Sequence, residues 1–172
     1  MNGQVESSFK RLQDLIKDIR FAMFTTHGAG DVLHARPMTT QKAKMERPDD
    51  DDKLWFFMSR SSEPVAELLA DPRVNVSYAD SRHDTYVSVA GTASLGDDMD
   101  HKERFWNTMT EAWFPKGIED PDLTLVCVQI HSAEYWNVEE GKLTQMAKMV
   151  KMVKAAIMGE RPADMGKHGK ID

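Results

Sequence analysis

Apolar residues near the start of the chain recur every three or four positions, which predicts an amphipathic helix over Glu6–Arg20. Further along, the apolar runs become short and rich in β-branched and aromatic residues, as is typical of strands. The residues expected on the buried face of the helix are Phe9, Leu12, Leu15, Ile16 and Ile19. The runs with this pattern are Phe21–His27, Val32–Thr40, Lys53–Ser59, Arg73–Asp80, Thr85–Leu95, Leu123–His131 and Ala133–Val138, and about six of them are expected as strands of the barrel.

Turn and cap residues separate these runs. Gly28–Asp31 has the composition of a hairpin turn between the first two strands. Ser61 or Ser62 is expected to cap a short helix that has Pro64 in its first turn and ends at Asp71-Pro72. The inward face of this helix is predicted to consist of Val65, Leu68 and Leu69.

A longer helix is predicted from Asp97 or Asp98 to Trp113, after a strand that contains Gly91. A glycine inside a strand indicates a bulge or a close approach of another backbone. The apolar side of the longer helix is predicted to consist of Met99, Phe105, Trp106 and Met109.

Strands at hairpin spacing, without a helical crossover after each one, favour an antiparallel sheet over a doubly wound parallel sheet. The sequence therefore predicts an α+β fold with a small antiparallel barrel and flanking helices. Residues 1–140 would form the barrel domain. Residues 141–172 would add to the same domain an amphipathic helix, about Lys142–Met158, and a polar tail without a fold of its own.

This last predicted helix carries methionine and aliphatic residues on one side and lysines on the other. The pattern is typical of a helix that packs on its own domain or across a dimer. Binding to a membrane surface or a partner groove is the less favoured alternative.

Composition narrows the class of protein. With 172 residues, 41% hydrophobic and 29% charged, the chain can bury the core of one globular domain. A net charge of −6 and a pI near 5.5 do not favour nucleic-acid binding. No apolar run approaches the roughly 20 residues needed to cross a membrane, and Met1–Glu6 lacks the apolar stretch of a signal peptide. Cys127 is the only cysteine and lies in an apolar run, so we expect a buried, inert thiol and a reducing cytoplasm.

The candidate chemistry lies between Arg36 and Val76, where a strand, a polar turn and a second strand lead into a short helix. This order brings together a guanidinium, several hydroxyls and a helix N-terminus, which are groups that bind a phosphate monoester. We therefore expect a site for flavin mononucleotide (FMN). The six histidines show no metal-ligand spacing, and Asp49–Asp52 is expected to be a solvated loop, so no metal site is predicted.

Several segments together carry a resemblance to a known family: Ala35–Gln41, Leu54–Pro64, Asp71–Val76, Tyr86–Ala93 and Ala112–Leu123. In this order they resemble the general stress protein branch of the pyridoxamine 5'-phosphate oxidase-like superfamily, over roughly Phe9–Val138. The resemblance implies a split β-barrel homodimer that binds FMN at the subunit interface, with FAD as the alternative flavin. It implies a flavin-binding stress-response protein and leaves open a weak flavin-dependent oxidoreductase activity on an unknown substrate.

The cofactor-binding residues that the resemblance implies are Arg36, Pro37, Met38, Thr39, Thr40, Gln41, Phe57, Met58, Ser59, Arg60, Ser62 and Tyr86. Arg36 matches the arginine that meets the phosphate, and residues 37–40 match the strand beneath the isoalloxazine ring. Phe57, Met58 and Ser59 match the second flavin segment. Ser62 aligns with a hydroxyl that contacts the phosphate.

Four positions depart from the oxidases of the superfamily. Gln41 replaces a lysine, and Glu63-Pro64 replaces an arginine-lysine pair that holds the phosphate. Tyr86 replaces a glutamine that touches the flavin. Arg60 is the neighbouring residue that would compensate. Losing two basic partners weakens the expected hold on the phosphate, and with no matching Arg-x-His element the chain is not expected to oxidise pyridoxamine phosphate.

Other readings stay open at this point. Arg36 would be an ordinary strand arginine if it paired with Asp31 or Glu46, and Trp113 and Trp136 are expected in the core or a dimer interface. The chain would then be a non-catalytic dimeric interaction module that has lost its cofactor. Haem binding has the least support, because no histidine occupies an argued axial position.

Overall fold

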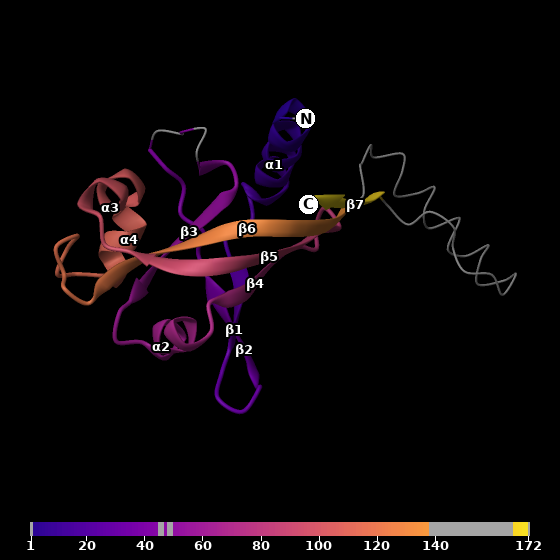
Figure 1. The fold of residues 1–172 in the computed structure, drawn as a ribbon. Coiled ribbons are helices and arrows are strands. Elements are labelled where there is room, and N and C mark those ends of the chain that lie inside the picture. The colour runs from indigo at the N-terminus through magenta and orange to yellow at the C-terminus, as the bar shows by residue number, and fades with distance from the viewer. Residues whose placement is uncertain (1, 45–46, 48–49, 138–166, 172) are drawn as a thin grey trace, which may run out of the picture.

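Seven strands form one sheet that curls into a split barrel, with helices packed around it (Figure 1). The computed structural model describes residues 2–44, 47, 50–137 and 167–171. Its elements in chain order are α1 (Asn2–Ile16), β1 (Ala22–His27), β2 (Leu33–Met38), β3 (Lys53–Ser59), α2 (Glu63–Ala70), β4 (Arg73–Asp80), β5 (Thr85–Gly96), α3 (Met99–Phe105), α4 (Thr108–Trp113), β6 (Leu123–Asn137) and β7 (Lys167–Ile171). The predicted α+β class and antiparallel barrel are confirmed.

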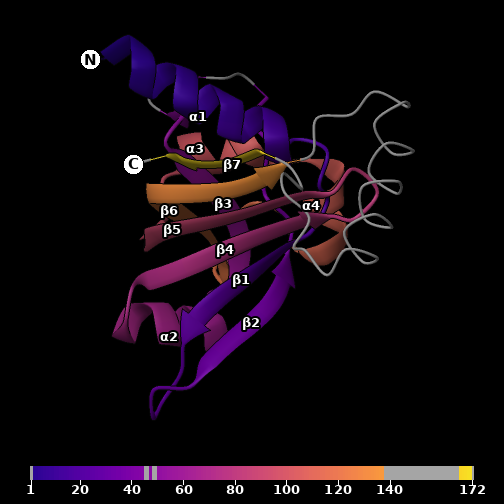
Figure 2. The same cartoon turned by 90° about the vertical axis from the view of Figure 1, so that its right-hand side faces the viewer.

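The strand order is β2-β1-β4-β5-β6-β3, with β7 paired to β6, and every pairing is antiparallel. Figure 2 shows β6, β5, β4, β1 and β2 side by side, with α1 at one end of this row and α2 beside β1 and β2 at the other. Beyond β2 the chain meets β3, where the amide of Gln41 donates to the carbonyl of Trp55 at 2.8 Å. Because β2 and β3 are the two end strands of this order and are not paired with each other, the barrel is open between them, and the β1–β2 hairpin lies along this open side.

The interior holds two groups of buried apolar side chains. The larger group fills the barrel and includes Leu12 and Ile16 of α1, which confirms the buried face predicted for that helix. The smaller group lies against α3 and consists of Trp55, Phe57, Phe105, Leu123 and Leu125. Because β3 alternates its side chains between these two groups, it is buried on both faces, which explains its unbroken apolar sequence.

Two expectations about element boundaries are wrong. The strands predicted at Leu123–His131 and Ala133–Val138 are one long strand, β6, which pairs with β5 along its length. The helix predicted from Asp97 or Asp98 to Trp113 is two helices, because the Asn107 side chain accepts hydrogen bonds from the amides of Met109 and Thr110 and starts α4. Met109 consequently faces solvent.

Other expectations fail at single residues. Leu69 on α2 and Met99 on α3 are exposed, whereas Val65, Leu68 and Phe105 are buried as predicted. Trp113 and Trp136 are both exposed, so neither is a core residue of this chain. The tail was expected to have no fold, but residues 167–171 form β7 on the edge of β6. The helix predicted at residues 142–158 lies outside the described residues.

Gly91 fulfils both expectations for a glycine inside a strand. The register between β5 and β6 shifts between Ala90 and Gly91, which marks a bulge. A Cβ atom at this position would overlap the carbonyl oxygen of Gln129 and lie 2.8 Å from Cγ1 of Val128. The strands can therefore approach this closely only because residue 91 has no side chain.

Replacing Gly91 by alanine should consequently destabilise the fold. We expect Gly91→Ala to lower the free energy of unfolding by about 1–3 kcal/mol, as overpacking does in other cores. Gly96→Ala in the same strand is the control, because its Cβ would meet the nearest atom at 3.5 Å, an ordinary contact. Urea unfolding of both variants measures the difference, and equal stabilities would contradict the close-approach argument.

Candidate functional site

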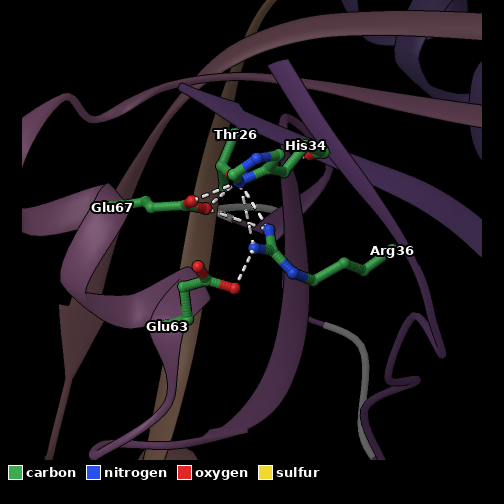
Figure 3. Close-up of polar contacts among 5 residues, drawn as sticks. All are labelled: Thr26, His34, Arg36, Glu63 and Glu67. Atoms are coloured by element: carbon green, nitrogen blue, oxygen red, sulfur yellow. Dashed lines mark hydrogen bonds and ion pairs between the residues drawn. The ribbon is translucent and has the colours of Figure 1, made fainter. Parts of the chain in front are cut away.

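Five polar side chains meet where the β1–β2 hairpin faces α2 (Figure 3), and we call them the Arg36 cluster. The cluster consists of Thr26, His34, Arg36, Glu63 and Glu67. His34 and Arg36 are two residues apart on β2, so they share one face of the strand. Glu63 and Glu67 are four residues apart on α2, so both point to the hairpin from one side of the helix.

Arg36 is the centre of these contacts. Its Nη1 donates to Glu67 Oε2 and to Thr26 Oγ1, both at 2.9 Å, and its Nη2 donates to Glu63 Oε2 at 2.8 Å. Glu67 also accepts a hydrogen bond from the Thr26 hydroxyl at 2.6 Å and lies 2.6 Å from Nδ1 of His34. Asp31, one of the two predicted alternative partners, is therefore not among those that the structure gives Arg36; the other, Glu46, lies outside the described residues.

The two carboxylates differ sharply in environment. The Glu67 side chain is 9% exposed, whereas that of Glu63 is 70% exposed. Burial opposes ionisation of Glu67, but hydrogen bonds from Arg36, Thr26 and His34 outweigh it and lower the pKa to about 2. The same hydrogen bond to Glu67 raises the pKa of Arg36 above its ordinary value. Glu67 and Arg36 thus form a buried ion pair, and Glu63 forms a second, solvent-exposed ion pair with the same arginine.

The N-terminus of α2 lies beside this pair. Ser62 occupies the N-cap position, but its hydroxyl donates to the carbonyl of Ser59 at 2.6 Å instead of capping the helix. The Ser59 hydroxyl in turn donates to Asp122, and Arg60 forms an ion pair with Asp97. Among the predicted phosphate partners, Arg36 and Ser62 adjoin the helix N-terminus, while Ser59 and Arg60 are engaged by other carboxylates.

The strand-end residues lie between the hairpin and α4. Thr40 Oγ1 is 2.7 Å from the hydroxyl of Tyr78, whose pKa burial raises. The side-chain oxygen of Gln41 accepts a hydrogen bond from Asn107 at 2.9 Å, and the side-chain nitrogen of Gln41, Nε2, donates to the carbonyl of Thr39 at 3.0 Å. These contacts hold the segment after β2 in a fixed place between the two elements.

Other predicted site residues are largely taken up by packing. Phe57 and Met58 are both buried in the core. Met38 packs against the larger core group, whereas Pro37 on the same edge strand is exposed. The side chains of Phe57 and Met58 are therefore not available to a ligand in this structure.

Tyr86 lies on the opposite face of the sheet from Arg36. The neighbours of Tyr86 along β5, Thr85 and Val87, are buried, so Tyr86 itself points outward, next to Trp136 on β6. Exposed aromatic and apolar side chains gather there around a shallow hollow of about 310 Å³. Its lining includes Phe21, Met23, Ser77, Tyr86 and Trp136. We call this surface the outer aromatic face.

Sequence reasoning missed Thr26, His34 and Glu67. The spacing of Glu63 and Glu67 on one helix face was the available signal, together with the alternation of His34 and Arg36 along β2. The structure also brings ligand atoms of His34, Glu63 and Glu67 within 4.8 Å of one another. The Arg36 guanidinium already supplies positive charge to both of these carboxylates.

Cys127 is half-buried in β6, and burial raises the pKa of its thiol to about 11. The thiol is therefore protonated at neutral pH, as expected of an inert cysteine, but it is less buried than the sequence predicted. Among the described residues, no helix combines the length and the apolar character that crossing a membrane requires.

Residues 7–163 match the family described as "Pyridoxamine 5'-phosphate oxidase like". The chain belongs to this family. Protein bli-3 of Neurospora crassa is 30% identical over 140 residues, which cover 76% of this chain and 65% of that protein. The chain thus spans less than two thirds of the length of this relative.

Solved structures of general stress proteins share the fold. A candidate general stress protein 26 from Jannaschia sp. CCS1 superposes with a TM-score of 0.70 at 23% identity, over 96% of this chain and 98% of that one. A general stress FMN/FAD binding protein from Xanthomonas citri superposes with a TM-score of 0.62 at 27% identity, over 82% and 93% of the two chains. The first likeness shows the shared fold, and the second, together with the family match, supports the general stress protein branch that the sequence resembles.

Neutralising the buried carboxylate of the Arg36 cluster should alter how stability depends on pH. Because the pKa of Glu67 falls from 4.5 to about 2 on folding, its stabilisation is present above pH 4.5 and is lost as the pH falls toward 2. We expect Glu67→Gln to cost about 3 kcal/mol at neutral pH, since it breaks a buried ion pair, and to flatten this acid limb.

Glu63→Gln, one turn earlier on α2, is the matched control. It removes an exposed ion pair and should cost less than about 1 kcal/mol. Denaturant unfolding of the wild type and both variants from pH 7 to pH 2 measures the two effects. Coincident stability curves for wild type and Glu67→Gln over this pH range would show that the buried ion pair does not stabilise the fold.

Proposed function

We propose that this protein binds a flavin, FMN or FAD, at the interface of a homodimer and acts in a stress response. Membership of the pyridoxamine 5'-phosphate oxidase-like family supports this, as does the similarity to a general stress protein named for FMN/FAD binding. The lone cysteine suits a reducing cytoplasm. One structural observation carries the proposal: Glu63 and Glu67 of α2 hold the Arg36 guanidinium beside the N-terminus of that helix. The side chain of Ser62, the N-cap residue, does not cap this N-terminus.

The residues of the Arg36 cluster fit the phosphate of such a flavin on one condition. A guanidinium offers five N–H donors in a planar fork that matches phosphate oxygens. In Arg36, Nη1 is engaged by buried Thr26 and Glu67, whereas Nη2 donates to the exposed Glu63 and lies 3.4 Å from Nδ1 of His34. A phosphate would take the position of the Glu63 carboxylate and gain the positive end of the α2 dipole.

The arrangement of the remaining predicted residues supports a site shared by two copies. Arg36 faces α2 on one side of the sheet, and Tyr86 belongs to the outer aromatic face on the other. One ligand cannot easily touch both side chains within one copy of the chain. In a dimer that packs through the outer aromatic face, Tyr86 of one copy would approach the ligand held by the other.

A bound flavin would supply redox chemistry, and the protein would supply binding and orientation. Arg36 and Ser62 would hold the phosphate, and the strand end at residues 37–40 would lie beneath the ring. The described residues offer no assigned acid or base for a substrate, so the proposal extends to flavin binding and leaves the substrate open. Oxidation of pyridoxamine phosphate is not part of it.

One observation favours a second candidate, a dimeric interaction module that has lost its cofactor. Both carboxylates of the Arg36 cluster already neutralise its single guanidinium. A cation that is satisfied within the chain has less to gain from a phosphate. The two candidates therefore differ in whether a flavin can displace Glu63 from Arg36.

Removing the guanidinium should weaken binding of the phosphorylated flavin specifically. Each charge-assisted hydrogen bond contributes roughly 1.5–3 kcal/mol, so we expect Arg36→Ala to bind FMN about tenfold or more weakly. Riboflavin, which has no phosphate, should bind the variant and the wild type alike. Quenching of flavin fluorescence on titration with protein measures both affinities.

Arg36→Ala leaves the buried Glu67 carboxylate without its cation, so a second comparison guards against misfolding. The double variant Arg36→Gln/Glu67→Gln is titrated beside Glu67→Gln alone, and Arg73→Ala, at an exposed arginine of β4, is the control. Unchanged FMN affinity in folded Arg36 variants would remove Arg36 from the phosphate site. A wild type that binds neither flavin would favour the cofactor-free module.

A charge placed on the outer aromatic face should dissociate the proposed dimer. Trp136→Glu would bring a carboxylate into an apolar contact surface, where desolvation without a partner is costly. Leu69→Glu, at an exposed apolar residue on α2, is the control. Sedimentation equilibrium should show a dimer for the wild type and Leu69→Glu and a weakened dimer for Trp136→Glu. Equal masses for all three would contradict this interface.

A further inference from the structure

We infer that Glu63 is a specificity residue, which competes with the flavin phosphate for Arg36 and so reduces the preference of the site for phosphorylated over unphosphorylated flavin. The inference rests on the proposed flavin site. In the sequence, Glu63 stands out only because it replaces a basic residue of the oxidases. The structure adds its contact with Arg36.

The competition follows from the unequal hold of the two carboxylates on Arg36. Glu67 has three partners in the cluster and is nearly enclosed, so it stays in place when a ligand arrives. Glu63 has one contact in the cluster, to Nη2 of Arg36 at 2.8 Å, and its side chain is 70% exposed. An exposed ion pair of this kind contributes little to stability, so Glu63 is the partner that can be displaced.

The charges of the cluster explain why the need to displace Glu63 disfavours a phosphorylated flavin. One guanidinium faces two carboxylates, so a phosphate dianion brought to Nη2 would meet the Glu63 carboxylate at the same donor. Like charges at this distance repel, and the repulsion is only partly screened beside a half-buried arginine. Riboflavin brings no charge to this position. Glu63 therefore weakens FMN binding without weakening the contacts of the ring.

A graded series at residue 63 tests this inference. Wild type, Glu63→Gln and Glu63→Lys are titrated with FMN and with riboflavin under one salt condition. We expect the affinity for FMN to rise about three- to tenfold in Glu63→Gln and further in Glu63→Lys, in keeping with the energies of single ion pairs. The affinity for riboflavin should stay within twofold throughout the series.

Glu103→Gln, at an exposed glutamate of α3, is the matched control because it changes the net charge by the same amount. It should leave both affinities unchanged, which separates competition at Arg36 from a general electrostatic effect. Thermal unfolding midpoints of all four proteins establish that each is folded. Repeating the FMN titration at high salt should shrink the difference between wild type and Glu63→Gln.

The outcomes separate this inference from the proposed function. If wild type binds both flavins and Glu63→Gln binds FMN no more tightly, the inference is overturned while flavin binding stands. If both flavins tighten equally, Glu63 acts on the ring or the fold, and the inference is again overturned. FMN binding by Glu63→Gln but not by wild type would support the competition and refute flavin binding by the natural protein. Failure of every variant to bind any flavin would overturn both.

Discussion

The buried carboxylate of Glu67 is the constraint on which the open side of this barrel depends. A carboxylate placed between a helix and an edge hairpin must be paired, because an isolated buried charge costs far more than the contacts around it contribute. Arg36, Thr26 and His34 supply that pairing from the two strands of the hairpin. In doing so they fix α2 against β1 and β2, where the sheet has no further strand to hold the hairpin.

The same pairing determines what the site can bind. By fixing Nη1 of Arg36, Glu67 positions the guanidinium and leaves Nη2 directed toward the N-terminus of α2. An anion at that position would have a preorganised donor, since the contacts of the fold already fix the rotamer of Arg36 and binding need not order it. Glu63 occupies the position in the free protein. A structural ion pair thus both builds the candidate site and limits its affinity for a phosphate.

Much of the fold could be predicted because local signals and burial agree. Two strands, Lys53–Ser59 and Arg73–Asp80, have the boundaries expected from their apolar patterns and flanking turns. The close approach of β6 to residue 91 could be predicted because this residue is a glycine inside a strand. The break between α3 and α4 was missed because apolar residues continue across Asn107, and only the capping hydrogen bonds reveal a new helix. Leu69 was misplaced because a short helix offers few turns from which to judge its buried face.

The site was harder to predict for a physical reason. Arg36 was found through resemblance, but whether its charge is free depends on α2 lying against the hairpin, which is a tertiary fact. A glutamate on a short helix ordinarily faces solvent, so the sequence gives no sign that Glu67 is buried while Glu63, one turn away, is not. Tyr86 illustrates the same limit, because only the pairing of β5 with β6 places it on the outer aromatic face.

The most direct test of this account is a crystal structure of the protein grown with FMN. The account predicts that Nη1 of Arg36 keeps its contacts with Glu67 and Thr26, while a phosphate oxygen replaces the Glu63 carboxylate at Nη2. A phosphate bound elsewhere, with the contact between Arg36 and Glu63 intact, would contradict it.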